Sequence, residues 1–503
     1  MTEADSMKIL MAAAELSPYA KVGGLADAVS GLSKALAAEG HVVRICLPYY
    51  GEGSNLQNGG EGSEKVFEAE LPLRPSRKVK LRVRPSPEPL DALVLVDEPL
   101  LFSRAGIYGD PATGQGYEDN GERFLVFSAA AAAAASLFRH LDGFTPDVVH
   151  CHDHQTGLVP AFLRHGAAGL RPEAPVGTVF TIHNLGYQGV HGADLFARTG
   201  LDSHLMRPLG PLEFHGKMNL MKAGIALSDR ITTVSPTYAE EICTPELGEG
   251  LDGLLRERRG SLIGILNGVE TEVWDPATDR LIPFRYTPGN LAGKGKDRKA
   301  LLEAFQFSGT GPGTPVLGMI SRLAPQKGFD LLLQAIDAIM EMDLRLVILG
   351  AGDEEYRRGL TEALRRHPDR LGLRIGFDER LAHLIEAGSD MFVMPSRYEP
   401  CGLNQMYSLR YGSVPLVRAT GGLADTVVDM DEDPPRANGF VFRQYLALEL
   451  VKTVRRAVRA FGDRKSWKEL MRRGMETDFS WNRSAARYLE VYKAAAAEAR
   501  RAA

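Results

Sequence analysis

The sequence predicts an α/β protein with two doubly wound, Rossmann-like domains that face each other across a cleft. The main observation is an alternation between two kinds of segment: short apolar runs that end in glycine, proline or polar turns, and stretches with helical period. This alternation runs through both halves of the chain. The chain has 503 residues, 44% of them hydrophobic, which is enough for more than one core.

The apolar runs are expected to be the central strands of two parallel sheets. In open sheets of this kind, ligands bind at the carboxyl ends of strands, so the turns that follow the runs are the expected site. In the first half the runs are KILMAAAEL (8–16), DVVHCH (147–152), TVFTIH (178–183) and RITTVS (230–235). In the second half they are LIGILN (262–267), PVLGMIS (315–321), LRLVILG (344–350), MFVMPS (391–396) and VPLVRA (414–419).

The division between the domains is placed after residue 264, where the charged segment RERRG leads into the strand LIGIL. We expect residues 1–264 in the first domain and residues 265–479 in the second. The segment 480–503 has an end rich in alanine and arginine and predicts a long helix. This helix is expected to pack back on the first domain.

No membrane association is expected from the apolar segments. The longest, FLVFSAAAAAAASLF (124–138), is shorter than the roughly 20 residues that a membrane span requires, and charged or polar residues follow it. Its run of alanines predicts a tightly packed helix. The start of the chain, MTEADSMKIL, is acidic where a signal peptide would be basic.

Charge and cysteine usage limit the partners and the compartment. Lys and Arg total 59 against 64 Asp and Glu, and the net charge of -5 gives no reason to expect nucleic acid. Small anionic ligands are still allowed, because they need only a local cluster of cations. The four cysteines have no CxxC spacing, which argues against a zinc ribbon or a disulfide framework and favours free thiols in a reducing cytoplasm.

The segment KVGGLADAV (21–29) predicts a glycine turn between a strand and a helix. Gly23 and Gly24 let the backbone turn tightly, the first amide groups of the helix can face an anion, and Lys21 adds a positive charge. A plain glycine turn with a solvated lysine is the alternative. A second segment, TGGLADTV (420–427), repeats the glycine pair without the cation. The dinucleotide fingerprint GxGxxG and the P-loop pattern are absent from the first turn.

Two segments of the second half predict phosphate and sugar contacts. SRLAPQKG (321–328) places Arg322 and Lys327 on either side of a turn before a helix, an arrangement that suits a diphosphate. Solvated surface cations are the alternative. SRYEPCGL (396–403) places Glu399 in another strand-to-helix turn, where a carboxylate can accept hydrogen bonds from sugar hydroxyls or simply cap the helix.

The segment HCHDHQTGL (150–158) favours a hydroxyl acceptor over a metal site. Alternate strand residues lie about 7 Å apart, which is wide for three histidines on one ion. Asp153, at the carboxyl end of the strand, is the favoured functional residue. His183 occupies the same kind of position after the next strand and can donate to a substrate oxygen, although it could also be a packed histidine.

Taken together and in this order, the motifs resemble the bacterial glycogen synthase and plant starch synthase family over essentially the whole chain. The segments that carry the resemblance are KVGGLADAV, HCHDHQTGL, TIHNLGYQG, MKAG (221–224), VSPTYAEEI, LNGVE, SRLAPQKG, SRYEPCGLNQMYSLRYG, TGGLADTV and DFSW (478–481).

The resemblance implies a two-domain glycosyltransferase of the GT-B type. Such an enzyme transfers glucose from ADP-glucose to the 4-hydroxyl at the non-reducing end of an α-1,4-glucan such as glycogen, with retention of configuration. The first domain is then on the acceptor side, and the second binds the nucleotide sugar. No metal ion or other cofactor takes part in the family's chemistry, because ADP-glucose is a co-substrate.

The resemblance also assigns roles to residues. By position, Arg322 and Lys327 match the pair that neutralises the donor diphosphate, and Glu399 matches a carboxylate beside the donor glucose. His183 and Asp153 match residues that line the glucose site. The matching donor contacts are Lys21, Gly23, Gly24, Asn267, Cys401, Gly402 and Leu403.

The sequence departs from the family's wider pattern at two positions. Val22 replaces the family's usual threonine, and Tyr407 stands where other retaining GT-B enzymes have a second glutamate.

Three alternative functions are considered, and a related enzyme that uses UDP-glucose or a small-sugar acceptor is the first. A nicotinamide oxidoreductase would require GxGxxG after a strand. A non-catalytic glucan-binding protein would have no need for the pair of cations in SRLAPQKG.

Overall fold

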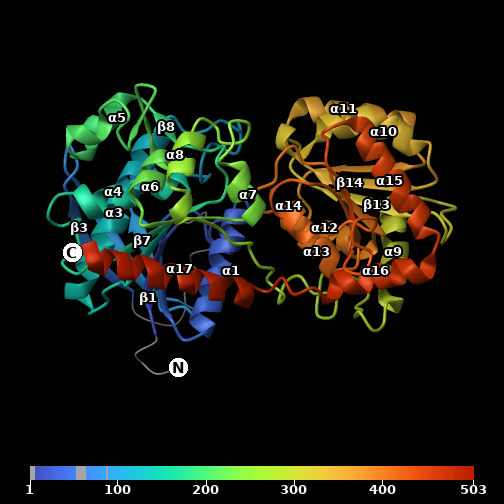
Figure 1. The fold of residues 1–503 in the computed structure, drawn as a ribbon, viewed down its shortest axis with the longest axis horizontal. Coiled ribbons are helices and arrows are strands. Elements are labelled where there is room, and N and C mark those ends of the chain that lie inside the picture. Colours follow the sequence, from blue (N-terminus) through green and yellow to red (C-terminus); the bar gives the residue numbers. More distant parts are fainter. Residues whose placement is uncertain (1–5, 52–63, 87–88, 503) are drawn as a thin grey trace. The chain divides into compact units, whose positions relative to one another are not determined.

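Two α/β units make up the chain in the computed structural model, which describes residues 6–51, 64–86 and 89–502 (Figure 1). The first unit comprises the chain up to Val234, Ala239–Gly268 and the chain from Trp481 onward. The second comprises Ser235–Tyr238 and Val269–Ser480. The main passage from the first unit to the second therefore follows Gly268, whereas the sequence placed the division after residue 264. The prediction of two α/β domains with parallel sheets is confirmed. The run LIGILN was wrongly expected in the second sheet, because β12 (Leu262–Gly264) is the edge strand of the sheet in the first unit.

The sheet of the first unit is parallel apart from one strand near its edge, β4, which runs antiparallel to both of its neighbours. In order across the sheet, the strands are β12 (Leu262–Gly264), β11 (Arg230–Thr233), β7 (Gly177–Ile182), β6 (Val148–His152), β1 (Lys8–Ala12), β2 (Val42–Pro48), β5 (Ala92–Asp97), β4 (Arg77–Pro85) and β3 (Lys65–Leu71). A small antiparallel sheet is formed by β8 (Val190–His191), β10 (Lys217–Asn219) and β9 (Glu213–Phe214).

Helices cover both faces of this sheet. On one face, α1 (Gly24–Ala38) and α17 (Trp481–Ala502) contact each other, and α17 also packs on β7 (Figure 1). On the other face, α3 (Asn120–Leu141), α4 (Val159–His165) and α6 (Leu220–Leu227) pack in a row. The remaining helices in this part of the chain are α2 (Pro99–Phe102), α5 (Ala193–Thr199), α7 (Pro236–Glu241) and α8 (Asp252–Glu257).

Helix α3 is long and apolar enough to cross a membrane by length and composition, but most of it is buried inside the first unit. Its alanines allow close packing, as the sequence predicted. Helix α17 begins where only glycines fit against it. A Cβ atom at Gly31 would lie 1.9 Å from Nε1 of Trp481, and one at Gly268 would lie 2.5 Å from the backbone nitrogen of the same residue.

The sheet of the second unit is parallel throughout the strands that the structure describes, and it is buried on both faces. Across the sheet, the order is β15 (Leu371–Ile375), β14 (Arg345–Gly350), β13 (Val316–Ile320), β16 (Met391–Met394), β17 (Val414–Arg418) and β18 (Phe440–Phe442). Successive residues of β13 and β16 join two different hydrophobic cores, one on each face. This double burial explains why the strands are continuous apolar runs in the sequence.

One core of the second unit lies beneath α10 (Phe329–Met340), α11 (Glu354–Arg366) and α15 (Ala447–Phe461), and α10 contacts both of the other helices. The opposite core is covered by α9 (Ala292–Ala304) and α12 (Glu379–Gly388). The unit also contains α13 (Asn404–Arg410), α14 (Gly421–Thr426) and α16 (Arg464–Glu476).

Candidate active site

Each unit has one place where the winding of the sheet reverses. In the first unit, β1 lies between β2 and β6, so the loops after β1 and β6 leave toward opposite faces. In the second unit, β13 lies between β14 and β16 in the same way. Loops that diverge leave a crevice at the carboxyl ends of the strands, which is where open α/β sheets bind ligands.

Most of the predicted site residues follow a strand at one of these two switch points. In the first unit, Lys21, Gly23 and Gly24 follow β1, Asp153 follows β6, and His183 follows the neighbouring strand β7. In the second unit, Arg322 and Lys327 follow β13, and Glu399, Cys401, Gly402 and Leu403 follow β16. Asn267 is the exception, because it follows the edge strand β12 and is buried there.

A buried carboxylate holds the glycine turn after β1. One oxygen of Glu15 accepts the backbone N–H groups of Val22 at 2.7 Å and Gly23 at 2.9 Å. The other oxygen accepts the hydroxyl of Tyr108 at 2.7 Å. Burial, followed by the charge of Glu15, raises the pKa of Tyr108 well above its usual value, so this phenol stays a donor. Lys21 is half exposed and forms an ion pair with Asp27 at 2.7 Å.

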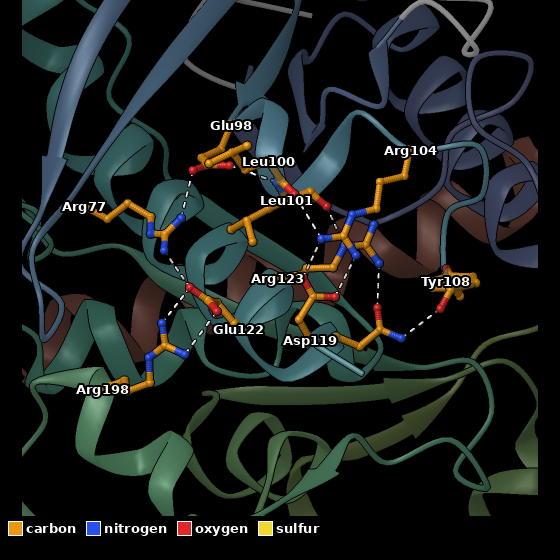
Figure 2. Close-up of polar contacts among 11 residues, drawn as sticks. Arg77, Glu98, Leu100, Leu101, Arg104, Tyr108, Asp119, Glu122, Arg123 and Arg198 are labelled. Carbon is orange, nitrogen blue, oxygen red and sulfur yellow. Dashed lines mark hydrogen bonds and ion pairs between the residues drawn. The ribbon is translucent and has the colours of Figure 1, made fainter. Parts of the chain in front are cut away.

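Tyr108 is in turn fixed by a buried arginine (Figure 2). Arg123 is completely buried; it donates to the carbonyl of Leu101 at 2.7 Å and to the side chain of Asn120. The amide of Asn120 then donates to the carbonyl of Tyr108 at 2.8 Å. The chain of contacts thus runs from the first turn of α3 to the glycine turn. The same figure shows a second set of ion pairs, which joins Arg77, Glu98, Glu122 and Arg198.

Asp153 is buried immediately after β6, in a backbone conformation that non-glycine residues rarely adopt, with φ of 56°. Its carboxylate accepts the backbone N–H of His183 at 2.7 Å and, more weakly, that of Asn184 at 3.4 Å. Burial raises the pKa of Asp153 to about 7, partly offset by these N–H groups, and the nearby Glu15 adds to the rise. The aspartate therefore ties the loop after β6 to the loop after β7.

Three histidines of this region, His150, His152 and His183, form a neutral series of contacting side chains. His150 contacts the hydroxyls of Tyr492 at 2.8 Å and Thr181 at 2.6 Å. His152 contacts His183, with Nδ1 of the first 3.0 Å from Nε2 of the second. Burial lowers the pKa of His150 and of His183 to about 3 and that of His152 well below its usual value.

The three histidines of HCHDHQTGL are held by different partners. The ring of His154 instead packs edge-on against the ring of Phe124, at a centroid distance of 5.6 Å. Within residues 6–51, 64–86 and 89–502 there is no group of three or more His, Cys, Asp or Glu side chains that could hold a metal ion.

An ion pair joins the two loops at the switch point of the second unit. The ammonium of Lys327 lies 2.9 Å and 2.6 Å from the two carboxylate oxygens of Glu399, and Ser396 donates to the same carboxylate at 3.0 Å. The side chains of Lys327 and Glu399 are only 19% and 6% exposed, so the pair is shielded from solvent. Arg322 is exposed, and no hydrogen bond joins its side chain to another described residue.

The second glycine pair, in TGGLADTV, supports the loop that carries Glu399. A Cβ atom at Gly421, where φ is 42°, would lie 2.0 Å from the carbonyl oxygen of Glu399, and one at Gly422 would lie 1.9 Å from that of Cys401. The N–H of Gly422 also donates to the carbonyl of Glu399 at 3.2 Å. Close approach of two protein backbones therefore explains this pair of glycines.

The turn after Glu399 is held from α13. Gln405 donates to the carbonyls of Cys401 at 3.0 Å and Gly402 at 2.8 Å. Gly402 has φ of 69° and little room beside this amide. The neighbouring residue, Asn404, donates to the carbonyl of Ile320 at 2.8 Å, which fastens the loop to the end of β13. These side-chain contacts were not predicted.

Glu15, Tyr108 and Ser396 were not predicted from the sequence either. Glu15 did give a signal, because it is a single acid in the otherwise apolar run that forms β1 and its extension. An isolated acid in such a run must be bonded if it is buried. Tyr108 gave no such signal, since its partner lies 93 residues away along the chain.

The fold and the residues gathered at the two switch points define a two-domain glycosyltransferase of the GT-B type. Two family models match the chain: the starch synthase catalytic domain over residues 8–257 and glycosyl transferases group 1 over residues 302–473. Sucrose-phosphate synthase from Thermosynechococcus elongatus matches 97% of this chain and 98% of its own with a TM-score of 0.58. At 17% identity, this similarity shows the shared fold alone.

More similar proteins narrow the class to one family. Glycogen synthase from Anaeromyxobacter sp. (strain Fw109-5) is 45% identical over 498 residues, which is 98% of this chain and 100% of its own. Glycogen synthase from Geotalea uraniireducens (strain Rf4) is 44% identical over 98% of this chain and 99% of its own. The catalytic domain of starch synthase IV from Arabidopsis thaliana, solved bound to ADP and acarbose, is 34% identical; the match covers 98% of this chain and 100% of that one with a TM-score of 0.87. The chain belongs to the glycogen and starch synthase family, as its motifs predicted.

Acid should destabilise the first unit through its buried histidines. The folded pKa of His150, about 3, lies below the usual value of 6.5, so the unfolded chain binds more protons between these values. Stability then falls as the pH is lowered through this window, by up to about 1.4 kcal/mol per pH unit for one such group. We expect a shallower pH dependence of unfolding in His150→Gln, measured by urea unfolding at pH 7 and pH 4.5.

The surface variant His215→Gln provides the control for that comparison, because His215 is exposed. It should leave the pH dependence as in the wild type. Equal slopes for His150→Gln and the wild type would show that His150 does not stay neutral in the folded protein.

Proposed function

We propose that this glycosyltransferase transfers glucose from ADP-glucose to the non-reducing-end 4-hydroxyl of an α-1,4-glucan, elongating glycogen with retention of configuration. The observation that carries the proposal is the starch synthase IV structure, which was solved with ADP and acarbose and matches this chain over nearly its full length. The glycogen synthases that match at 44–45% identity support the glucan acceptor.

The switch point of the second unit supports a diphosphate site. Arg322 is exposed at the end of β13, and Lys327 is held at a fixed position by Glu399. As the bond between the anomeric carbon and the diphosphate breaks, negative charge develops on ADP. Cations that are already in place can stabilise that charge without reorganisation. The proposal therefore assigns charge stabilisation to protein side chains and requires no metal ion or other cofactor.

The first unit supplies groups suited to a sugar. In the proposal, Asp153 and His183 contact hydroxyls of the transferred glucose, and Lys21 adds a cation for the donor. The remaining donor contacts are proposed for Gly23, Gly24, Asn267, Cys401, Gly402 and Leu403. Glu399 is already bonded to Lys327 and Ser396, so its role in the proposal is to hold the lysine and the donor glucose, not to attack.

The acceptor hydroxyl is proposed to attack from the same face that ADP leaves. This hypothesis keeps the configuration without a covalent intermediate. A retaining hydrolase would instead place a nucleophilic carboxylate about 5 Å from a second carboxylate. The four cysteines are buried and no disulfide joins them, which is consistent with a reducing cytoplasm as the proposed compartment.

Transfer of radiolabelled glucose to glycogen tests the proposed function. With ADP-glucose we expect label in glycogen and one ADP released per glucose, and with UDP-glucose a lower kcat/KM. The label should be removed by an exo-hydrolase specific for α-1,4 linkages. Transfer to fructose phosphate with none to glycogen would identify a sucrose-forming type of enzyme, and efficient use of UDP-glucose alone would overturn the donor assignment.

Removal of Lys327 tests the assigned leaving-group stabilisation. We expect Lys327→Ala to lower kcat/KM for ADP-glucose by about 10²–10³-fold, the range found when one preorganised charge stabiliser is removed. Lys299→Ala is the matched control, because Lys299 is an exposed lysine of the same unit. Thermal melts should show that both variants are folded, because Lys327→Ala leaves the buried Glu399 without its partner. Unchanged transfer by folded Lys327→Ala would contradict the assignment.

A further inference from the structure

His152 and His183 meet at the carboxyl ends of two neighbouring strands, and their contact has only two possible proton arrangements. His152 is the last residue of β6, and His183 follows directly after β7. Nδ1 of His152 lies 3.0 Å from Nε2 of His183. Desolvation lowers the pKa of both rings, to about 3 for His183, so both are neutral near pH 7. One nitrogen of the pair must carry the shared proton, and the other must accept it.

The other nitrogen of His152 distinguishes between the arrangements. Its Nε2 is buried and has no hydrogen-bond partner among the described residues. The ring cannot turn to find one, because the ring of His150 packs against it at a centroid distance of 4.0 Å. His150 is itself fixed between Tyr492 of α17 and Thr181 of β7.

Suppose first that His183 donated from Nε2. His152 would then carry its proton on its own Nε2, where a buried N–H group would have no acceptor. Suppose instead that His152 donates from Nδ1. Its Nε2 would then be a bare nitrogen, and only a lone pair would lack a partner. Buried N–H groups without an acceptor are rarer in proteins than acceptors without a donor, so the second arrangement is favoured.

The second arrangement fixes the proton of His183 on Nδ1. That nitrogen lies on the other side of the ring from His152, and no hydrogen bond joins it to a described residue. The side chain of His183 is not fully enclosed, whereas that of His152 is 1% exposed. His183 therefore offers an N–H donor, and not a lone pair, away from the core.

We propose that His152 is a positioning residue that holds His183 as the Nδ1–H tautomer, so that His183 donates a hydrogen bond to an oxygen of the transferred glucosyl unit. The contact with substrate rests on the proposed function, whereas the tautomer does not. A neutral donor can bind a hydroxyl oxygen without adding a charge near the diphosphate. The direction of the Nδ1–H group is set before substrate arrives, so no binding energy is lost in reorienting the ring.

Nitrogen-15 NMR of the whole protein labelled at histidine tests the tautomer without substrate. Two-bond correlations within each imidazole distinguish protonated from bare nitrogens, and the signals lost in His183→Asn assign the ring. We expect His183 protonated on Nδ1 and bare on Nε2. A proton on Nε2 of His183 in the wild type would overturn the proposal whatever the activity.

Two substitutions of His152 test the link to catalysis. Asn can place an amide N–H close to the position of Nδ1 of His152. His152→Asn should therefore keep the His183 tautomer and retain most of the transfer activity of the wild type. His152→Leu removes the donor and should release His183 to the Nε2–H form, lowering kcat/KM by about 10–100-fold, as for loss of other groups that orient a functional histidine. His204→Leu, at an exposed position, is the control.

The outcomes separate this proposal from the proposed function. If His152→Leu is folded by thermal melt and keeps both the tautomer and kcat/KM, or if His152→Asn loses as much activity as His152→Leu while keeping the tautomer, the proposal is wrong. If the wild type does not transfer glucose from ADP-glucose, the proposed function fails, while the NMR result still decides the tautomer. If His152→Leu fails to fold, the wild-type spectrum and His152→Asn decide.

Discussion

A buried carboxylate at each switch point is the interaction on which the arrangement of the site depends. Burying a charged carboxylate is costly unless hydrogen bonds or cations satisfy it, so its partners are fixed wherever it lies. Glu15 fixes the glycine turn through two backbone N–H groups, and Glu399 fixes Lys327. In both units the reversal of winding creates the crevice, and the carboxylate then holds in place the loop that carries a cation.

The two units divide the chemistry between neutral and charged groups. In the first, burial keeps the three facing histidines neutral and raises the pKa of Asp153 to about 7, so these groups act mainly through hydrogen bonds. In the second, Lys327 is held in a shielded ion pair with Glu399. Neutral donors and acceptors suit sugar hydroxyls, whereas fixed cations suit a leaving diphosphate.

The fold was predictable because parallel strands buried on both faces are continuous apolar runs, and the turns after them carry the functional residues. The segments that follow β1, β6, β13 and β16 were found for this reason. Contacts between distant residues left no such pattern. Lys327 and Glu399 are 72 residues apart, and Tyr108 and Glu15 are 93 apart, so their pairing depends on the folded chain. The second glycine pair was recognised, but its close contact with the Glu399 loop was not.

The assignment of the diphosphate site to the second switch point is tested most directly by calorimetry of ADP binding. Arg322 is the better residue for this measurement, because it is exposed and its removal leaves no buried partner uncompensated, unlike that of Lys327. A lost charge-assisted hydrogen bond should weaken binding by about 10–100-fold in Arg322→Ala. The exposed Arg365→Ala should bind as the wild type does. An unchanged Kd for Arg322→Ala would contradict the assignment.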